Sequence, residues 1–293
     1  MANIMLIYPN RSDIATYSGG AWVEAMPLDN LKDRAFARVA RSIDLDPENT
    51  TFTIDFGRTW PIRLFSFIAH NLTVSARIKI EASNSADISS PVHNQTYDAF
   101  ASLAGSDWDI NALEWENDNY WLGSYTAEDT VGQTAIASIL FPQNIVARYW
   151  RVTFFDQSNS AGFIQVGRLF LGDAFLVPTY NPALGLDLGY EDATGVDTAL
   201  NGAEFFDPRE PIRVMRFQLQ YLDDTEGYTR ALELTRRAGV WKEIFVIADP
   251  DDAVYAMQRN FPARLRQLNP LETVMYGYDT NYHSMAMELK EIR

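Results

Sequence analysis

Hydrophobic and polar residues alternate through much of the first half of the chain. Residues 51–56 place Phe52, Ile54 and Phe56 on one side of an extended backbone and polar residues on the other. Side chains of a strand point alternately to its two faces, so this period of two indicates a half-buried β-strand. Residues 64–69 and 76–82 continue the pattern. The first half is therefore predicted to consist mainly of β-strands.

Two strong segments close this half, at residues 148–155 and 163–175, and a polar stretch that ends in Gly162 joins them. The composition of this stretch favours a hairpin loop. Gly167 and Gly172 interrupt the second segment. Glycine within a strand pattern indicates a bulge or a close approach of another backbone, which would let a long strand bend around the corner of a β-sandwich.

The pattern changes after Pro178. Residues 179–207 contain four glycines, Pro182 and few long apolar runs, and are expected to form an irregular linker or arm. The first domain is predicted over residues 1–178 and a second over 208–293.

The expected strands of the second domain are residues 213–221, 243–248, 273–278 and 284–292, with a helix over 226–238 and a short one from Asp249 to Met257. Within the first of these strands, Val214, Phe217, Leu219 and Tyr221 are expected on the buried side. The fold class expected is mainly β, with a smaller β-rich α+β domain at the C-terminal end.

Composition restricts the partners and the chemistry. The chain has 293 residues, a formal net charge of -15 and no cysteine. Such an acidic chain is not expected to bind nucleic acid or an anionic membrane surface, because both are recognised largely through Lys and Arg. The lack of cysteine excludes disulfides, thiolate nucleophiles and cysteine-bound metals. The apolar run at residues 4–7 is too short for a signal peptide or a membrane span, so a chain folded in the cytoplasm without membrane insertion is expected.

The motifs of the common catalytic classes are missing from the sequence, which predicts that the chain is not an enzyme and holds no cofactor or metal. Neither a Gly-x-Ser-x-Gly elbow nor a glycine-rich phosphate loop occurs. His70, His93 and His283 are widely spaced and are expected to be ordinary loop or strand residues. Residues 107–111 space their oxygen ligands like a calcium loop, but Ala112 stands where an EF-hand needs glycine. A looser calcium site and a solvated acidic loop both remain open for this segment.

An aromatic and acidic stretch supplies the candidate binding residues. Flat rings stack on sugar rings while carboxylates and amides bond to hydroxyl groups, but aromatic residues also fill cores and subunit interfaces. The candidates for glycan or interface contact are Trp108, Trp115, Tyr120, Trp121 and Tyr125. Carboxylates of the same stretch could also serve a glycoside hydrolase, which needs two of them at a fixed separation.

Three arginines form a second candidate surface. Arg34, Arg38 and Arg41 recur at helical or turn spacing. In so acidic a chain they could form the basic side of a subunit contact, and an exposed helix face would explain them equally well.

The last strands of the first half resemble a known family. Residues 148–154 read Arg-Tyr-Trp-Arg-Val-Thr-Phe, and residues 162–172 read Gly-Phe-Ile-Gln-Val-Gly-Arg-Leu-Phe-Leu-Gly. These segments are similar to the closing strands of galactose-binding-like (discoidin-type) jelly rolls, in the form common in tail proteins of tailed bacteriophages. Residues 28–31 and 53–57 are similar to the opening of that family. The resemblance covers roughly the first 175 residues and implies a jelly-roll β-sandwich, but it carries no ligand residue over to numbered positions.

The second half resembles the β-rich core of phage distal-tail proteins, at residues 245–250 and 284–292. This resemblance implies a structural component of a tail tip or baseplate, located in the virion tail, that forms a homo-oligomeric ring around the tail axis. Its partners would be other copies of itself, other tail proteins and, for host attachment, a host-surface glycan. The alternatives are a carbohydrate-binding module that recognises host-surface glycans and a polysaccharide-degrading enzyme. Extracellular discoidin-type members usually carry a disulfide, which this chain lacks.

Overall fold

The computed structural model describes residues 3–100, 133–182, 185–252, 255–276 and 281–293. The chain forms two compact units. Unit 1 contains Met1–Leu6, Phe175–Asp249 and Gln258–Arg293, and unit 2 contains Ile7–Ala174 and Pro250–Met257. The predicted domains over 1–178 and 208–293, with a linker or arm over 179–207, stay a prediction. The two units divide the chain differently, chiefly because unit 1 includes the N-terminal residues and the expected linker.

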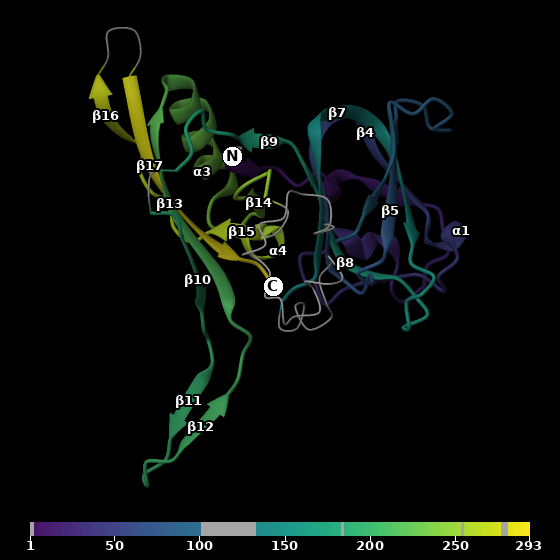
Figure 1. Ribbon diagram of the computed structural model, residues 1–293, viewed down its shortest axis with the longest axis horizontal. Coiled ribbons are helices and arrows are strands. Elements are labelled where there is room, and N and C mark those ends of the chain that lie inside the picture. The colour runs from purple at the N-terminus through teal and green to yellow at the C-terminus, as the bar shows by residue number, and fades with distance from the viewer. Residues whose placement is uncertain (1–2, 101–132, 183–184, 253–254, 277–280) are drawn as a thin grey trace, which may run out of the picture. The chain divides into compact units, whose positions relative to one another are not determined.

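Unit 2 is a β-sandwich built on a seven-stranded sheet with the order β3-β8-β4-β7-β5-β6, in which β2 also pairs with β4 (Figure 1). Its strands are β2 (Thr16–Ser18), β3 (Ala40–Arg41), β4 (Phe52–His70), β5 (Arg77–Ser83), β6 (His93–Asp98), β7 (Ile136–Phe155) and β8 (Gln165–Gly172). Its short helices are η1 (Ser12–Ile14), η2 (Leu28–Lys32) and α1 (Pro47–Thr50). The predicted mainly β class with a jelly-roll sandwich is confirmed.

The two long strands β4 and β7 create the sandwich because each takes part in both layers. Their pairing shifts register between Asp55 and Trp60 and again between Ile62 and Leu64. The part of β7 that pairs with residues 52–55 of β4 also pairs with β5. The part of β4 that pairs with residues 136–140 of β7 also pairs with β8. The strands β7 and β8 therefore lie on either side of β4. The hairpin expected between them is wrong, and the polar loop is a crossover.

The sequence pattern placed the core of unit 2 correctly. Phe52, Ile54 and Phe56 are all buried. Gly167 shows the close approach that its position indicated, because a Cβ there would overlap the carbonyl oxygen of Phe36. The fully buried Trp150 lies 5.8 Å from the ring of Phe65 and forms the centre of an aromatic cluster between the layers.

Unit 1 contains most of an eight-stranded sheet with the order β10-β13-β17-β15-β14-β1-β9, in which β16 also pairs with β17. The chain crosses between the units within β1 (Met5–Ile7), within β9 (Ala174–Leu176) and on either side of residues 250–257. The other strands are β10 (Asp187–Glu191), β13 (Ile212–Leu222), β14 (Ile244–Ile247), β15 (Phe261–Leu265), β16 (Glu272–Tyr276) and β17 (Asn281–Glu291). A separate two-stranded sheet is formed by β11 (Gly195–Thr198) and β12 (Glu204–Asp207). Strands thus occupy much of the segment that was expected to be irregular.

The predicted helix over 226–238 is present as a π-helical segment, η4 (Thr225–Leu232), that continues into α3 (Glu233–Ala238). It ends as expected at Gly239, whose φ of 55° suits glycine and whose N–H donates to the carbonyl of Thr235 at 2.9 Å. The second predicted helix, from Asp249 to Met257, is wrong in extent: residues 249–252 and 255 are not helical, and the described helix there is α4 (Ala256–Arg259). No helix of the described segments is both long and apolar enough to cross a membrane.

A buried ion pair joins the ends of β13 and β17 in unit 1. The Arg213 guanidinium donates to Glu291 Oε1 at 2.5 Å, and the backbone N–H of Arg213 donates to Glu291 Oε2 at 3.0 Å. The side chains are only 2% and 0% exposed. Removing one partner of a buried pair leaves an uncompensated charge in a medium of low dielectric.

Replacing Glu291 with glutamine is therefore expected to lower the free energy of unfolding by about 3–5 kcal/mol. The matched control is Glu210→Gln, because Glu210 pairs with Arg293 but is 68% exposed. This control should cost no more than about 1 kcal/mol. Urea denaturation of both variants measures the difference, and equal losses would contradict a buried pair at Glu291.

A buried histidine in unit 2 makes stability depend on pH. His70 Nδ1 accepts a hydrogen bond from the backbone N–H of Leu72 at 3.1 Å. Burial lowers the pKa of His70 to about 4, although the nearby Asp156 carboxylate acts in the opposite direction. Protonation would both charge a buried ring and remove the acceptor at Nδ1.

Because the folded state binds this proton less readily than the unfolded state, its stability should fall as pH decreases from about 6.5 through 4. The full contribution is about 3 kcal/mol. Replacing His70 with glutamine keeps an acceptor but removes the titration. Chemical denaturation at pH 7 and pH 4.5 should show that the wild type loses about 2–3 kcal/mol more than His70→Gln. An identical loss in both proteins would contradict the lowered pKa.

Candidate functional site

The predicted aromatic candidates cannot define the site. Trp108, Trp115, Tyr120, Trp121 and Tyr125 all lie outside the described residues. The possible calcium loop and the acidic residues beside it lie in the same segment. The role of these aromatic residues in glycan or interface contact stays a prediction.

The three candidate arginines lie on a loop and a short strand of unit 2. The helix η2 ends at Lys32, so the explanation by an exposed helix face is wrong. Arg38 pairs with Asp33 at 3.0 Å, and Arg41 donates to Gln165 at 2.8 Å. Arg34 is exposed on the same loop. Their part in a subunit contact stays a prediction.

The three histidines occupy three separate strands. His70 ends β4, His93 begins β6 and His283 lies in β17. His283 Nε2 contacts Asp224 at 2.8 Å, and His93 contacts the Tyr97 hydroxyl at 2.9 Å. Across the described ranges, no group of three or more metal-ligating side chains comes together.

The outward face of β13 and β17 in unit 1 carries the strongest candidate site. Phe217 and Leu219 are buried, whereas Arg216 and Gln218 between them are exposed. Strand alternation thus gives the sheet an apolar inner face and a polar outer face. Three adjoining depressions lie along the outer face, with volumes of about 270, 270 and 400 Å³. Arg216 lines the depression of 400 Å³ and one of those of 270 Å³, and Gln218 lines both of those of 270 Å³. The three therefore form one continuous depression, which we call the outer-face groove.

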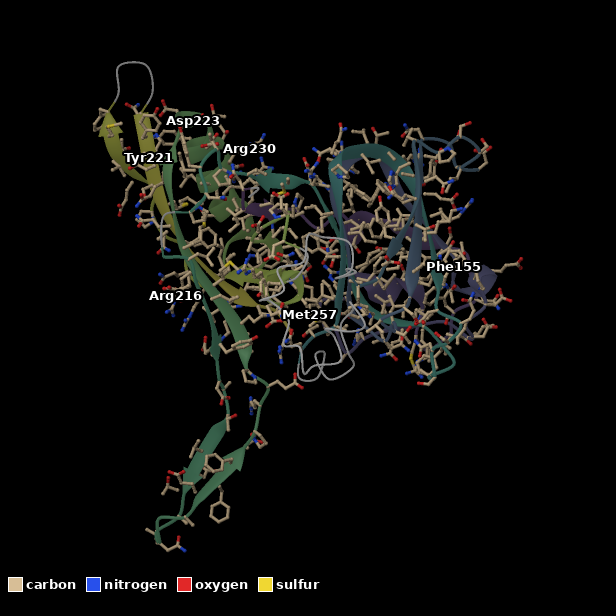
Figure 2. All side chains as sticks on the ribbon, in the orientation of Figure 1. Phe155, Arg216, Tyr221, Asp223, Arg230 and Met257 are labelled. Carbon is tan, nitrogen blue, oxygen red and sulfur yellow. The ribbon has the colours of Figure 1, made fainter. Side chains whose placement is uncertain are left out.

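One end of the outer-face groove is aromatic because β13 contains a bulge. The register with β17 shifts between Leu219 and Leu222. Tyr221 within the bulge has a φ of 57°, which is rare for a bulky residue and costs free energy. The bulge turns the Tyr221 side chain to solvent, where it is 57% exposed (Figure 2). Its expected burial is therefore wrong.

Tyr221 is the central ring of three. Its centroid lies 6.1 Å from that of Tyr180 and 6.4 Å from that of Tyr282, with interplanar angles of 72° and 76°. These edge-to-face contacts hold the Tyr221 ring in one orientation while leaving much of it exposed. The depression beside it is also lined by Val274 and Met275 of β16. An aromatic surface with apolar neighbours is thus presented at this end of the outer-face groove.

Three side-chain amides, from Gln218, Gln267 and Asn269, line the middle of the outer-face groove beside apolar residues. The Gln218 amide donates to Ser284 Oγ at 2.8 Å, and Ser284 itself lines the aromatic end. Asn269 donates to the carbonyl of Ala286 at 2.9 Å, and Gln267 lines the same depression. Amide groups combine donors and an acceptor, so they can serve ligand hydroxyl groups in either sense.

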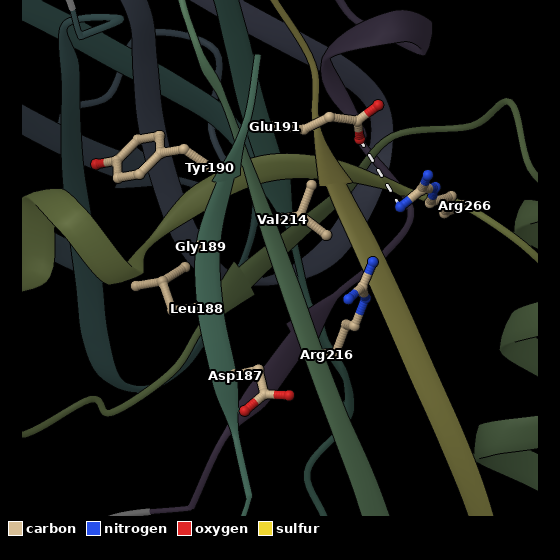
Figure 3. Close-up of a pocket in the computed structure, with 8 residues that line it drawn as sticks. All are labelled: Asp187, Leu188, Gly189, Tyr190, Glu191, Val214, Arg216 and Arg266. Atoms are coloured by element: carbon tan, nitrogen blue, oxygen red, sulfur yellow. Dashed lines mark ion pairs between the residues drawn. The ribbon is translucent and has the colours of Figure 1, made fainter.

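The other end of the outer-face groove is an ion-pair network. Arg216 and Arg266 both donate to Glu288 Oε1, at 2.8 and 2.9 Å. Glu191 lies 3.1 Å from Lys290. It also lies 3.7 Å from Arg266 (Figure 3). The hydrogen bond from Arg216 lowers the pKa of Glu288, and that from Lys290 lowers the pKa of Glu191. Both carboxylates therefore stay ionised at neutral pH. Asp187 also lines this end, so three carboxylates face three cations and little net charge remains.

Sequence reasoning found the strands of this site but missed the site itself. The alternation along residues 213–221 marks Arg216 and Gln218 as outward-facing. The sequence could not predict the exposure of Tyr221, because this residue continues the hydrophobic alternation of the strand. Only the bulge in β13 turns its side chain to the outer face. The partners at Glu191, Arg266 and Ser284 come from distant parts of the chain.

The similarity of this chain to known proteins is confined to solved structures of low sequence identity. No family model matches the chain, and no curated protein sequence matches it. Similar solved structures include a family 32 carbohydrate-binding module from a family 31 glycoside hydrolase of Clostridium perfringens (14% identity, TM-score 0.37), which covers 57% of this chain and 99% of that module. Another C. perfringens family 32 module, solved with galactose, has 13% identity and a TM-score of 0.36, covering 58% and 99%. A Streptococcus pneumoniae fucose-binding module has 11% identity and a TM-score of 0.37, covering 57% and 98%. Similarities of this size carry no information about the ligand of this chain.

The positive φ at Tyr221 predicts an unusual order of stability among its variants. Glycine and alanine both remove the ring, but only glycine adopts this backbone conformation without strain. The strain is about 1–2 kcal/mol, and the extra freedom of glycine in the unfolded chain offsets about 0.4–1 kcal/mol of it. Tyr221→Gly should therefore be about 0.5–1 kcal/mol more stable than Tyr221→Ala in urea denaturation. A more stable alanine variant would contradict the bulge conformation.

Proposed function

We propose that this chain is a carbohydrate-binding protein and that the outer-face groove of unit 1 binds a neutral oligosaccharide. The observation that carries the proposal is the continuity of the groove from the Tyr221 ring to the Arg216 network. A sugar chain has apolar ring faces and many hydroxyl groups. The exposed tyrosine suits the first, and the amides of the middle section suit the second.

The charge of the outer-face groove favours a neutral ligand. Arg216 and Arg266 are both committed to Glu288, and Glu191 also faces Arg266. An anionic sugar would have to compete with these carboxylates for the guanidinium groups. A neutral sugar can accept hydrogen bonds from guanidinium N–H groups and donate to the carboxylates without breaking the ion pairs.

The comparisons do not bear equally on the roles that the resemblance implies. One similar module was solved with galactose and another is described as fucose-binding. The proposed carbohydrate ligand of this chain rests on the outer-face groove and not on that likeness. Nothing in the comparisons supports the expected place in a phage tail tip, which stays a prediction, as do the virion location and contacts with other tail proteins. The expectation that the chain is not an enzyme stays a prediction too.

Binding of the full chain to an array of neutral and acidic oligosaccharides tests the proposal. We expect binding to neutral members. For the best binder, calorimetry should show that Tyr221→Ala weakens affinity about tenfold, because stacking on an aromatic ring contributes about 0.5–1.5 kcal/mol beyond area burial.

The matched control is Trp241→Ala, since Trp241 is a similarly exposed aromatic residue, 60% exposed, that does not line the outer-face groove. It should leave affinity unchanged. Preference for acidic glycans would overturn the neutral ligand. Sugar binding that is insensitive to both Tyr221→Ala and Gln218→Ala would overturn the proposed site.

A further inference from the structure

A two-stranded ribbon extends unit 1 beyond the paired strands β10 and β13 (Figure 1). β11 and β12 form it, with a register from Gly195 opposite Asp207 to Thr198 opposite Glu204. Every residue of both strands is exposed. An isolated two-stranded hairpin is marginally stable in water, so a partner surface would stabilise it. We call residues 192–210 the arm.

The arm carries large apolar side chains on both faces. Phe205 and Phe206 are adjacent, so their side chains point to opposite faces of the ribbon. They are 64% and 61% exposed. Val196 lies opposite Phe206, and Leu200 is exposed at the tip. Exposed apolar residues gathered on one element indicate an interaction surface.

The arm is also acidic. It contains five carboxylates and one basic residue: Asp192, Asp197, Glu204, Asp207 and Glu210 against Arg209. A complementary partner surface would combine basic side chains with apolar ones.

The same chain offers such a surface on its helical segment. Tyr228, Leu232 and Arg236 recur every four residues along η4 and α3, and all three are exposed. Trp241 adds an exposed ring just beyond the helix. Residues 225–242 contain four basic side chains and two acidic ones, in a chain whose net charge is -15. We call these residues the helix surface.

Local contacts hold the positive charge of the helix surface in place. Arg236 and Arg237 both donate to Glu233, at 2.6 and 2.5 Å. The guanidinium groups of Arg230 and Arg237 also lie 5.6 and 5.8 Å from the centre of the Phe175 ring. One glutamate balances only part of the charge of three arginines, so the surface keeps a positive excess.

A single copy cannot join these two surfaces, because α3 and the β11–β12 ribbon lie at opposite ends of unit 1 (Figure 1). We propose that the arm of one copy docks on the helix surface of a second copy. The contact is head-to-tail, so each copy offers one arm and one helix surface. Such contacts generate closed rings or open filaments. The proposal does not depend on the outer-face groove or its ligand.

Cysteine cross-linking tests the pairing directly, because the chain has no cysteine of its own. Thr198→Cys places one thiol on the arm, and Thr229→Cys in a second preparation places one on the helix surface. Mixing and mild oxidation should give a disulfide dimer of the two variants. The control pairs Thr198→Cys with Val274→Cys, which is exposed on β16. No dimer with Thr229→Cys, or an equal yield with the control, would overturn the pairing.

Sedimentation velocity over a range of concentrations tests association of the full chain. The unmodified chain should associate, and Phe205→Ser with Phe206→Ser should weaken association about tenfold or more, as expected for aromatic residues that anchor an interface. Tyr276→Ala is the matched control, because Tyr276 is an exposed ring outside the arm and the helix surface, and it should associate normally. Reversing Arg236 and Arg237 to glutamate should weaken association, and mixing with a variant whose Asp197 and Glu204 are arginines should restore it. A chain that stays monomeric, or association unaffected by the arm substitutions, would overturn the proposal.

Discussion

The antiparallel pairing of β13 with β17 is the constraint on which the candidate site depends. This pairing places Phe217 and Leu219 on the buried side, so Arg216 and Gln218 must face outward. A slip of one residue would exchange the two faces, which the cost of exposing the apolar side prevents. The buried Arg213 and Glu291 pair joins the same two strands near their ends. The polar groove on the outer face is thus fixed by the packing of the inner face.

Local sequence patterns could predict the elements but not how distant elements pair. Alternation identified the buried residues Phe52 and Ile54, and a single glycine identified the end of α3 at Gly239. The hairpin expected between β7 and β8 was wrong because β4, more than 60 residues earlier in the chain, lies between them. Such long-range pairing leaves no signal in the loop that connects the two strands.

Tyr221 shows the same limit within the site. Its place in an alternating segment predicts a buried ring, and that inference would hold for a regular strand. The bulge opposite β17 moves the Tyr221 ring to the other face of the sheet. The positive φ of Tyr221 persists because the pairing of β13 with β17 on both sides of the bulge holds the backbone in place. The exposure of the Tyr221 ring is therefore a property of two strands together. The aromatic residues that the sequence favoured, such as Trp115 and Trp121, lie outside the described residues.

We propose that a neutral oligosaccharide lies along the outer face of β13 and β17. The decisive measurement is a titration of the full chain with such a ligand, followed through backbone amide shifts by nuclear magnetic resonance. The largest shifts are expected at Gln218, Tyr221 and Ser284, with smaller ones toward Arg216. Saturable shifts confined to residues 7–174, with β13 and β17 unchanged, would instead place sugar binding in the β-sandwich and overturn the proposed site.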